Sequence, residues 1–274
     1  MLELPEVLAR ARELNEALAG KAVAEALPPS AHHKFCWFSL PPEEYAARLK
    51  GRGFDGAEGF GIFVEMNFGG ERLCVNDGVT LRLLPPEEKR PAKYQLMLVF
   101  ADGWALAFTV SMYGGIYLHG GNWDNEYYRA SRERVSPLSE AFTPEYLASL
   151  ARSAKPSTSL KALLATEQRI PGLGNGVLQD ILLRAGLHPR RRADSLTGEE
   201  LDRLRSSIRG TLNEMAEKGG RDTERRLCGR PGGYQTLMCK NTPAAGCPLC
   251  GHPVARETYL GGAVYVCPRC QPMK

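Results

Sequence analysis

Four cysteines near the carboxyl end constrain the fold of this chain more than any other feature. Cys247 and Cys250 form one CxxC pair, and Cys267 and Cys270 form a second after sixteen intervening residues. Two such pairs, joined by a hairpin's length of chain, place four thiolates in a tetrahedron, which is the geometry that Zn²⁺ prefers. The sequence therefore predicts one structural zinc ion in a terminal finger that folds only with its metal.

The stretch between the two cysteine pairs has the pattern of a β-hairpin. Apolar and polar residues alternate on either side of Gly261-Gly262, which we expect to form the turn. The other four cysteines show no metal-binding spacing, and we predict that they are small buried apolar residues. These cysteines are Cys36, Cys74, Cys228 and Cys239.

Two apolar helical patterns meet at a glycine-containing corner between Ser159 and Pro189. The corner contains Gly172 and Gly174, and Asn175 is predicted to cap the second helix. A corner without side chains lets a polyanion approach closely, and a helix amino end offers free N–H groups to a phosphate. The alternative is an αα-hairpin that packs for its own sake, because helix–turn–helix geometry is common.

Charge is divided unevenly along the 274 residues. Residues 1–150 hold 15 Lys and Arg against 20 Asp and Glu, whereas residues 151–274 hold 20 against 11, so the two parts carry −5 and +9. A basic half of this size is typical of a partner that is an anionic polymer, and a solvated basic surface is the alternative. No apolar run reaches the roughly 20 residues of a membrane span, and the charged start excludes a signal peptide. We therefore expect a soluble cytoplasmic protein, associated with the nucleoid in a bacterium.

The order of patterns predicts an α+β fold. A helix begins near Pro5 and ends before Gly20, and short β-rich runs follow from about residue 21 to residue 118. Several such runs indicate a β-sandwich, interrupted by a short helix over 42–49. A polar linker near 130–143 then leads to helices over 144–154, the pair at the corner, and 199–218, before a Gly- and Arg-rich linker over 219–236. The predicted domains are 1–130 (sandwich, catalytic), 131–236 (helical) and 237–274 (finger).

Five motifs in one order carry a family resemblance. They are the start MLELPEV, the phrase SPLSEAFTPEYL, the corner PGLGNG followed by AGLHP, the loop GRPGGY, and the four-cysteine finger. The sequence resembles the formamidopyrimidine-DNA glycosylase / endonuclease VIII family. The resemblance implies a helix–two-turn–helix domain, damaged DNA in the cleft beside it, and base excision from a nucleotide that is rotated out of the duplex.

The resemblance also implies roles for individual residues. Glu3 matches the catalytic carboxylate that moves protons around the sugar, and Glu6 matches a second retained acid. Lys161 and Asn175 match phosphate contacts next to the corner glycines, and Arg230 with Tyr234 lies in a loop that closes near the extruded base. Whether Glu3 is protonated does not follow from sequence, because nearby charges and burial shift a carboxyl pKa either way.

Several positions depart from the family pattern. Leu2 stands where most members have a proline whose amine attacks the sugar, so the free amine is expected to be that of Met1. Met112 and Tyr113 replace an arginine and a phenylalanine that fill the gap left by the flipped base. Phe60 or Gly59 stands where a basic residue is expected, and Gly262 aligns with an arginine that grips a phosphate.

Two functions follow from this mixture of matches and departures. The first is a DNA repair glycosylase with possible lyase activity, in which Glu3 directs water or the Met1 amine at the sugar of damaged DNA. The second is a zinc-containing sensor of DNA damage or DNA structure that has lost its chemistry and binds through phosphate contacts. In the second case Glu3 is only a helix cap. One DNA site in a cleft needs only a monomer, and the lesion itself does not follow from the sequence.

Overall fold

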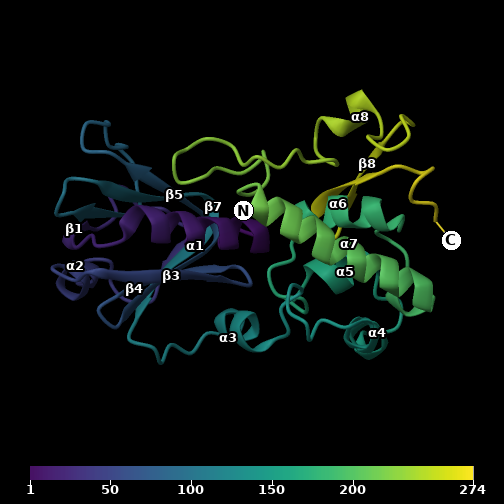
Figure 1. Ribbon diagram of the computed structural model, residues 1–274, viewed down its shortest axis with the longest axis horizontal. Helices are drawn as coiled ribbons and strands as arrows, with labels where there is room; N and C mark the ends of the chain where they lie inside the picture. Colours follow the sequence, from purple (N-terminus) through teal and green to yellow (C-terminus); the bar gives the residue numbers. More distant parts are fainter. Residues whose placement is uncertain (274) are drawn as a thin grey trace.

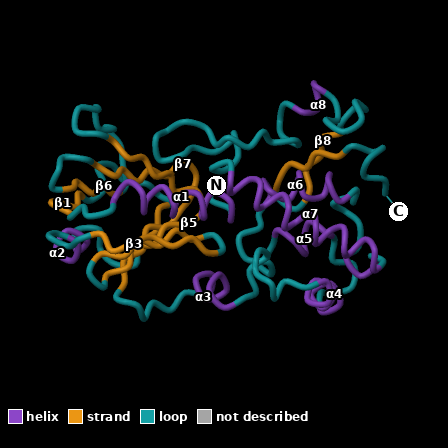
Figure 2. Tube along the Cα trace, in the orientation of Figure 1, coloured by secondary structure: helices purple, strands orange, loops and turns teal. Residues whose placement is uncertain are grey.

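One half of the protein contains the large sheet and the other contains most of the helices, and the amino terminus lies where the halves meet (Figure 1, Figure 2). The structure is a computed structural model that describes residues 1–273. Helix α1 (Leu4–Leu18) runs from this junction along the strand-rich half. Its start is fixed by a capping box, in which the side chains of Glu3 and Glu6 each accept a hydrogen bond from the backbone N–H of the other residue. Pro5 in the first turn favours the same start. Gly20, at φ 73°, follows the helix, as predicted.

The strand-rich half is a seven-stranded sheet folded over itself into a sandwich. The strand order is β1-β6-β7-β5-β4-β3, and β2 pairs in parallel with β7. The bounds are β1 Val23–Leu27, β2 Cys36–Phe38, β3 Phe54–Phe60, β4 Phe63–Phe68, β5 Glu71–Leu84, β6 Leu96–Phe100 and β7 Ala105–His119. A bulge between Asp77 and Val79 divides β5 into two parts, and both parts pair with β7. The first part also pairs with β4, and the segment of β7 opposite the second part also pairs with β6. The long strands β5 and β7 thus belong to both layers.

Three details of the strand-rich half correct the sequence interpretation. The β-rich runs of the sequence coincide with β2, β4, β5, β6 and β7 but do not include β1 and β3, and Asn76-Asp77-Gly78, which has the composition of a turn, is a bulge inside β5. Helix α3 (Glu126–Glu133) extends across the predicted start of the linker at residue 130, and its amino end is capped by the Asn125 side chain. The predicted short helix exists as α2 (Glu44–Leu49).

The helical half packs around one apolar core. Its helices are α4 Pro144–Ser153, α5 Leu160–Ala165, α6 Asn175–Ala185, the short 3₁₀ helix η1 Ala193–Ser195 and α7 Gly198–Glu217. Leu204, Ile208 and Leu212 form the buried stripe of α7 that the periodicity predicts. Gly186, at φ 68°, ends α6 in the left-handed conformation that glycine adopts without strain.

The finger follows the short helix α8 (Thr242–Ala245) and contains the hairpin of β8 (Ala255–Tyr259) and β9 (Gly262–Val266). Leu260 and Gly261 form the turn with φ of 46° and 74°, one residue before the predicted pair. Two positive φ angles in a two-residue loop are the geometry of a type I′ hairpin. The α+β architecture predicted from the sequence is therefore confirmed.

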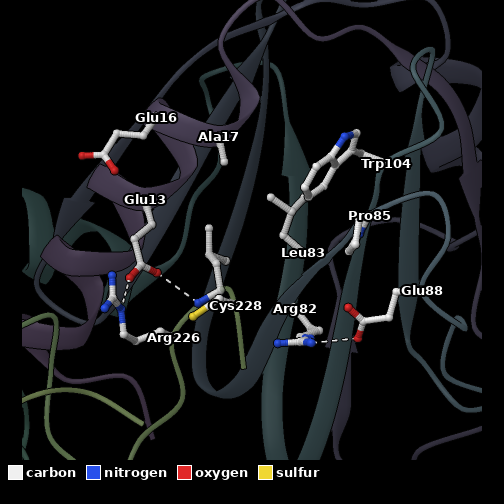
Figure 3. Close-up of a pocket in the computed structure, with 11 residues that line it drawn as sticks. Glu13, Glu16, Ala17, Arg82, Leu83, Pro85, Glu88, Trp104, Arg226 and Cys228 are labelled. Carbon is white, nitrogen blue, oxygen red and sulfur yellow. Dashed lines mark hydrogen bonds and ion pairs between the residues drawn. The ribbon is translucent and has the colours of Figure 1, made fainter. Parts of the chain in front are cut away.

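The segment 219–236, here called the strap, is more than the predicted linker. Figure 1 shows it running from the end of α7 back over β5 and β7 before it turns to the finger. Leu227 is buried in the sandwich core, and its carbonyl accepts from Leu83 N at 3.0 Å. Glu13 of α1 holds the strap through Arg226 Nε at 2.6 Å and Leu227 N at 3.0 Å (Figure 3). The strap therefore ties the two halves together.

No helix within residues 1–273 is long and apolar enough to cross a membrane.

Candidate active site

The Glu3 carboxylate caps helix α6, although the two are far apart in sequence. Its Oε1 accepts from Gly176 N at 2.9 Å and its Oε2 accepts from Val177 N at 2.6 Å. The sequence interpretation gave this role to Asn175, but Gly174 is the N-cap residue and its missing side chain is replaced by that of Glu3. These two N–H groups are therefore engaged by the Glu3 carboxylate, and the phosphate contacts predicted for Asn175 and the corner glycines remain a prediction.

The glycines of the corner admit the protein's own amino terminus. A Cβ on Gly172 would lie 2.6 Å from Leu4 Cβ and 2.5 Å from Gly61 O, and the φ of Gly172 is 80°. A Cβ on Gly174 would lie 2.6 Å from Glu3 Oε1. The missing side chains therefore admit the start of α1, and the approach of a polyanion to the corner remains a prediction.

A buried arginine joins the carboxylates at the junction. Arg221 of the strap donates from Nε and Nη2 to Glu6 at 3.0 and 2.9 Å, and its Nη1 lies 3.6 Å from Glu3 Oε2. The sequence interpretation treated the strap arginines as phosphate contacts or solvated groups, and Arg221 is neither, because it is almost fully buried. One indication of this contact was present in the sequence, because two neighbouring buried carboxylates need a cation. No spacing in the sequence identified which Lys or Arg supplies it.

The two carboxyl groups respond to the same surroundings in opposite directions. Burial raises the pKa of Glu3, and the Arg221 charge and the two α6 amides only partly offset that rise. Burial also acts on Glu6, but the Arg221 charge and its hydrogen bonds outweigh burial and lower the pKa of Glu6. Glu3 therefore exchanges its proton nearer to neutral pH, while Glu6 remains the ionised partner of Arg221.

The Met1 amine lies at the edge of this network. Met1 N donates to Glu224 Oε2 at 2.7 Å, and Leu2 is buried in the sandwich core with its N–H donating to Asp77 O at 2.6 Å. Anchoring of Leu2 holds the preceding residue in a cavity of about 250 Å³. The cavity is lined by Met1, Gly78, Thr80, Ser111, Met112, Tyr113, Thr223, Glu224 and Arg225. Glu224 was missed by sequence reasoning, since nothing in a Gly- and Arg-rich loop distinguishes it.

Lys161 and Asn175 lie together against the finger turn. Lys161 Nζ donates to Tyr259 O and, at 3.3 Å, to Gly262 O, and Asn175 Nδ2 donates to Ala263 O at 3.0 Å. A Cβ on Gly262 would lie 3.3 Å from Lys161 Nζ. Burial lowers the pKa of Lys161. The residues that the resemblance connects with phosphate are thus brought together, with part of their donor capacity used by the finger.

The other residues connected with DNA lie in different surroundings. Tyr234 is buried in the helical core, where its hydroxyl donates to Asp180 at 3.0 Å. Arg230 is exposed at the tip of the strap, and Met112 is exposed on β7. Phe60 is buried and is covered by Arg132 of α3, whose guanidinium lies 3.5 Å from the ring centroid. A cation therefore lies beside Phe60, although it comes from another part of the chain.

The four finger cysteines form a group that can hold a metal ion. The sulfurs of Cys247 and Cys270 lie 3.9 Å apart, and those of Cys250 and Cys267 lie 3.6 Å apart. These separations match the edges of a tetrahedron around one ion with Zn–S bonds of about 2.3 Å. The donors therefore fit a structural zinc ion.

A second group of donors, Glu65, Cys74 and His119, is buried under α3. His119 Nδ1 accepts from Gly121 N at 3.1 Å, so the proton of the neutral ring is on Nε2, which faces Cys74. A protonated Nε2 cannot bind a metal, and the group is a hydrogen-bond network instead. Of the cysteines predicted to be buried, Cys74 is buried and Cys36 and Cys239 are partly buried. Cys228 is exposed because it follows Leu227 out of the sandwich core, which corrects that prediction.

Comparisons with known proteins agree on one family. The formamidopyrimidine-DNA glycosylase H2TH domain matches residues 134–226. The formamidopyrimidine-DNA glycosylase of Symbiobacterium thermophilum is 32% identical over all of this chain and 90% of its own length. The crystal structure of the MutM (Fpg) protein of Thermus thermophilus has a TM-score of 0.80 at 28% identity, with 98% of each chain covered. The Lactococcus lactis Fpg in complex with abasic-site DNA has a TM-score of 0.85 at 22% identity, with 99% of this chain and 100% of that chain covered, which shows the shared fold.

Proposed function

Because the chain belongs to the formamidopyrimidine-DNA glycosylase family, we propose that Glu3 directs base excision at the junction between its two halves. The protein is a DNA repair glycosylase, and damaged DNA is its substrate. The observation that supports the role of Glu3 is its raised pKa at a buried position next to Arg221. A helix cap alone does not need this environment, because an exposed Asp or Ser caps a helix without the cost of burying a charge.

The proposed chemistry begins at the C1′ carbon of the damaged nucleotide. As the C1′–N bond breaks, its electron pair leaves with the base and a nucleophile forms a new bond to C1′. Glu3 accepts a proton from the nucleophile or donates one to the sugar oxygen as the ring opens, and the upward shift of its pKa by burial favours this exchange. Glu6 and Arg221 hold the carboxylate in place and do not react.

The proposed nucleophile is the α-amine of Met1, with water as the alternative. The amine is presented to the cavity by the buried Leu2 and is held by Glu224 at 2.7 Å. A primary amine that displaces the base at C1′ forms a Schiff base when the C1′–O4′ bond breaks and O4′ takes a proton, and this Schiff base makes lyase cleavage possible. The sensor without chemistry is not favoured, because Glu3 and Glu6 keep a buried network with Arg221, and the same strap holds the Met1 amine through Glu224.

Borohydride trapping tests the amine directly. The protein is incubated with a labelled duplex that contains one abasic site, and its amino-terminal residue is checked by intact mass. We expect a covalent adduct in the wild type and none in a variant whose amino terminus is extended by Gly-Ser. A trapped adduct in the extended variant would transfer the role to another amine, and the absence of any adduct with the wild type would leave the water route.

The finger is proposed to hold one Zn²⁺ on Cys247, Cys250, Cys267 and Cys270. Bound zinc supplies structure rather than chemistry, since four thiolates leave no open coordination position. The ion would hold the β8–β9 turn against Lys161 and Asn175, which we propose as phosphate contacts. We further propose that the protein acts as a monomer in the cytoplasm, since one DNA site needs only one copy of the chain.

A further inference from the structure

Four side chains form an exposed apolar row that continues from the candidate active site. They are Phe35, Trp37, Met112 and Tyr113, here called the aromatic strip. Phe35, Trp37 and Met112 are 49%, 48% and 68% exposed, although large apolar side chains are more often buried. The strip crosses two adjacent strands, because β2 pairs in parallel with β7 and Trp37 lies opposite Gly115. The rings of Trp37 and Tyr113 have centroids 6.4 Å apart.

The strip begins at the Met1 cavity. Met112 and Tyr113 line the same cavity as Met1, and the Tyr113 hydroxyl lies 3.9 Å from Met1 Sδ. The ring of Trp37 lies next to that of Tyr113 across the two strands, and Phe35 lies in the turn that precedes β2. Gly114 N donates to Phe35 O at 3.0 Å, which holds this segment beside β7. A strand of DNA whose reactive sugar lies at Met1 therefore passes its neighbouring nucleotides over the strip.

The chemistry of the strip suits nucleobases that have lost their partners. Aromatic side chains stack on single-stranded bases without sequence preference, whereas the bases of an intact duplex already stack on one another. Lys34 extends the strip with a cation, since its Nζ lies 5.3 Å from the Phe35 ring centroid and can meet the phosphate backbone. A side chain that wedges into a base stack can act alone. A row of side chains across β2 and β7 can instead support more than one base.

We propose that the aromatic strip binds unpaired nucleotides beside the damaged one, so that the preferred substrate is a lesion in single-stranded or bubble DNA. This inference rests on the proposed function for the position of the reactive sugar at Met1. The strip itself is defined by exposure, strand pairing and ring contacts, and its binding role is testable without catalysis.

Binding of one lesion analogue in three contexts tests the proposal. A tetrahydrofuran abasic analogue is placed in a duplex, in a bubble and in a single strand, and affinities are measured by fluorescence anisotropy at one salt concentration. We expect the wild type to bind the bubble and the single strand more tightly than the duplex. Trp37→Ala should weaken bubble and single-strand binding by about tenfold and change duplex binding by less than about twofold. Trp37→Phe keeps a stacking ring and should restore most of the affinity.

The matched control is Tyr127→Ala, which removes an aromatic side chain that is 55% exposed on α3. Tryptophan fluorescence gives a second readout, because single-stranded DNA should quench the wild type and leave Trp37→Phe almost unquenched. Unchanged bubble binding in Trp37→Ala, or an equal loss in all three contexts, overturns the proposal. A protein that binds DNA through the strip but releases no base would refute the proposed function and would still support the binding role of the strip.

Discussion

The amino terminus meets the helical half through charged side chains, whereas the finger meets it through backbone carbonyls. At the first junction, Arg221 joins Glu3 and Glu6 in a buried ionic network. At the second, Lys161 and Asn175 donate to carbonyl groups of the β8–β9 hairpin. The first junction holds charged side chains at buried positions. The second uses the Lys161 ammonium and the Asn175 amide as hydrogen-bond donors that hold the finger in place.

The difference indicates that the first junction serves the reaction and the second serves DNA binding. A buried carboxylate with a cation beside it is suited to proton transfer, because its pKa depends on fixed neighbours rather than on solvent. Lys161 and Asn175 are suited to positioning, since their remaining hydrogens can reach a phosphate only while the finger holds them. Changes at the first junction should therefore alter reaction and stability, and changes at the second should alter DNA binding.

Removal of the finger metal should have the largest effect and should act on the second junction alone. Structural zinc contributes about 10–16 kcal/mol of binding free energy in small fingers, so the finger should unfold without it. We expect Cys267→Ser to lose one zinc equivalent and at least about tenfold of DNA affinity. Metal analysis and anisotropy measure both, with the exposed Cys228→Ser as the control. A zinc-free variant with wild-type affinity would contradict the proposed role of the finger.

Arg221→Met should cause the next largest loss, at the first junction. The substitution leaves two buried carboxylates without their cation, which costs about 3–5 kcal/mol when one partner of a buried pair is removed. Urea unfolding measures the change, and Arg230→Met removes an exposed arginine of the same strap as a control. A loss below about 1 kcal/mol would mean that the network contributes little to folding.

The stabilities of Glu3→Gln and Glu6→Gln should depend on pH in opposite ways. The pKa of Glu3 is raised by folding, so wild-type stability falls as pH rises from the unfolded pKa through the folded one. The pKa of Glu6 is lowered, so its contribution is present above the unfolded pKa and is lost as pH falls through the folded one. Glu3→Gln should remove the first slope and Glu6→Gln the second, each at most about 1.4 kcal/mol per pH unit. Urea unfolding across the pH range measures both slopes, and equal slopes in the two variants would refute the opposite shifts.

Lys161→Met should have the smallest effect, and it should change only the affinity for DNA. Two finger carbonyls engage the ammonium, which leaves one hydrogen for a phosphate. Loss of one phosphate contact reduces the salt dependence of log Kd by about one unit of slope. Titrations at several salt concentrations measure it, and the exposed Lys155→Met serves as the control. An unchanged slope would make Lys161 a structural support of the finger only.

Periodic and spacing signals predicted most of the fold. The stripe of α7, the cysteine spacing and the alternation around Gly261 are local patterns, and each gave the correct element. Asn76-Asp77-Gly78 has the composition of a turn, but the long pairing of β5 with β7 makes it a bulge. Tertiary pairing of this kind leaves no local pattern.

The candidate site was predicted less completely than the fold. Glu3 and Glu6 came from the resemblance, whereas Arg221 and Glu224 come from a strap that folds back onto the amino terminus. The cap of α6 shows the reason. Asn175 fits the local rule for an N-cap, but Glu3 reaches the same amides from the other end of the chain. Long-range hydrogen bonds of this kind are set by packing, which a local residue pattern does not encode.

The most direct test of the account is the single-turnover rate of base release by Glu3→Gln. The substrate is a labelled duplex or bubble with one formamidopyrimidine lesion, and Glu16→Gln, an exposed site on the same helix, is the control. Glutamine keeps one oxygen for the α6 amides but cannot exchange the proton, so we predict a loss of about 100-fold or more with unchanged DNA affinity. A rate within about twofold of the wild type would contradict the account and leave Glu3 as the cap of α6.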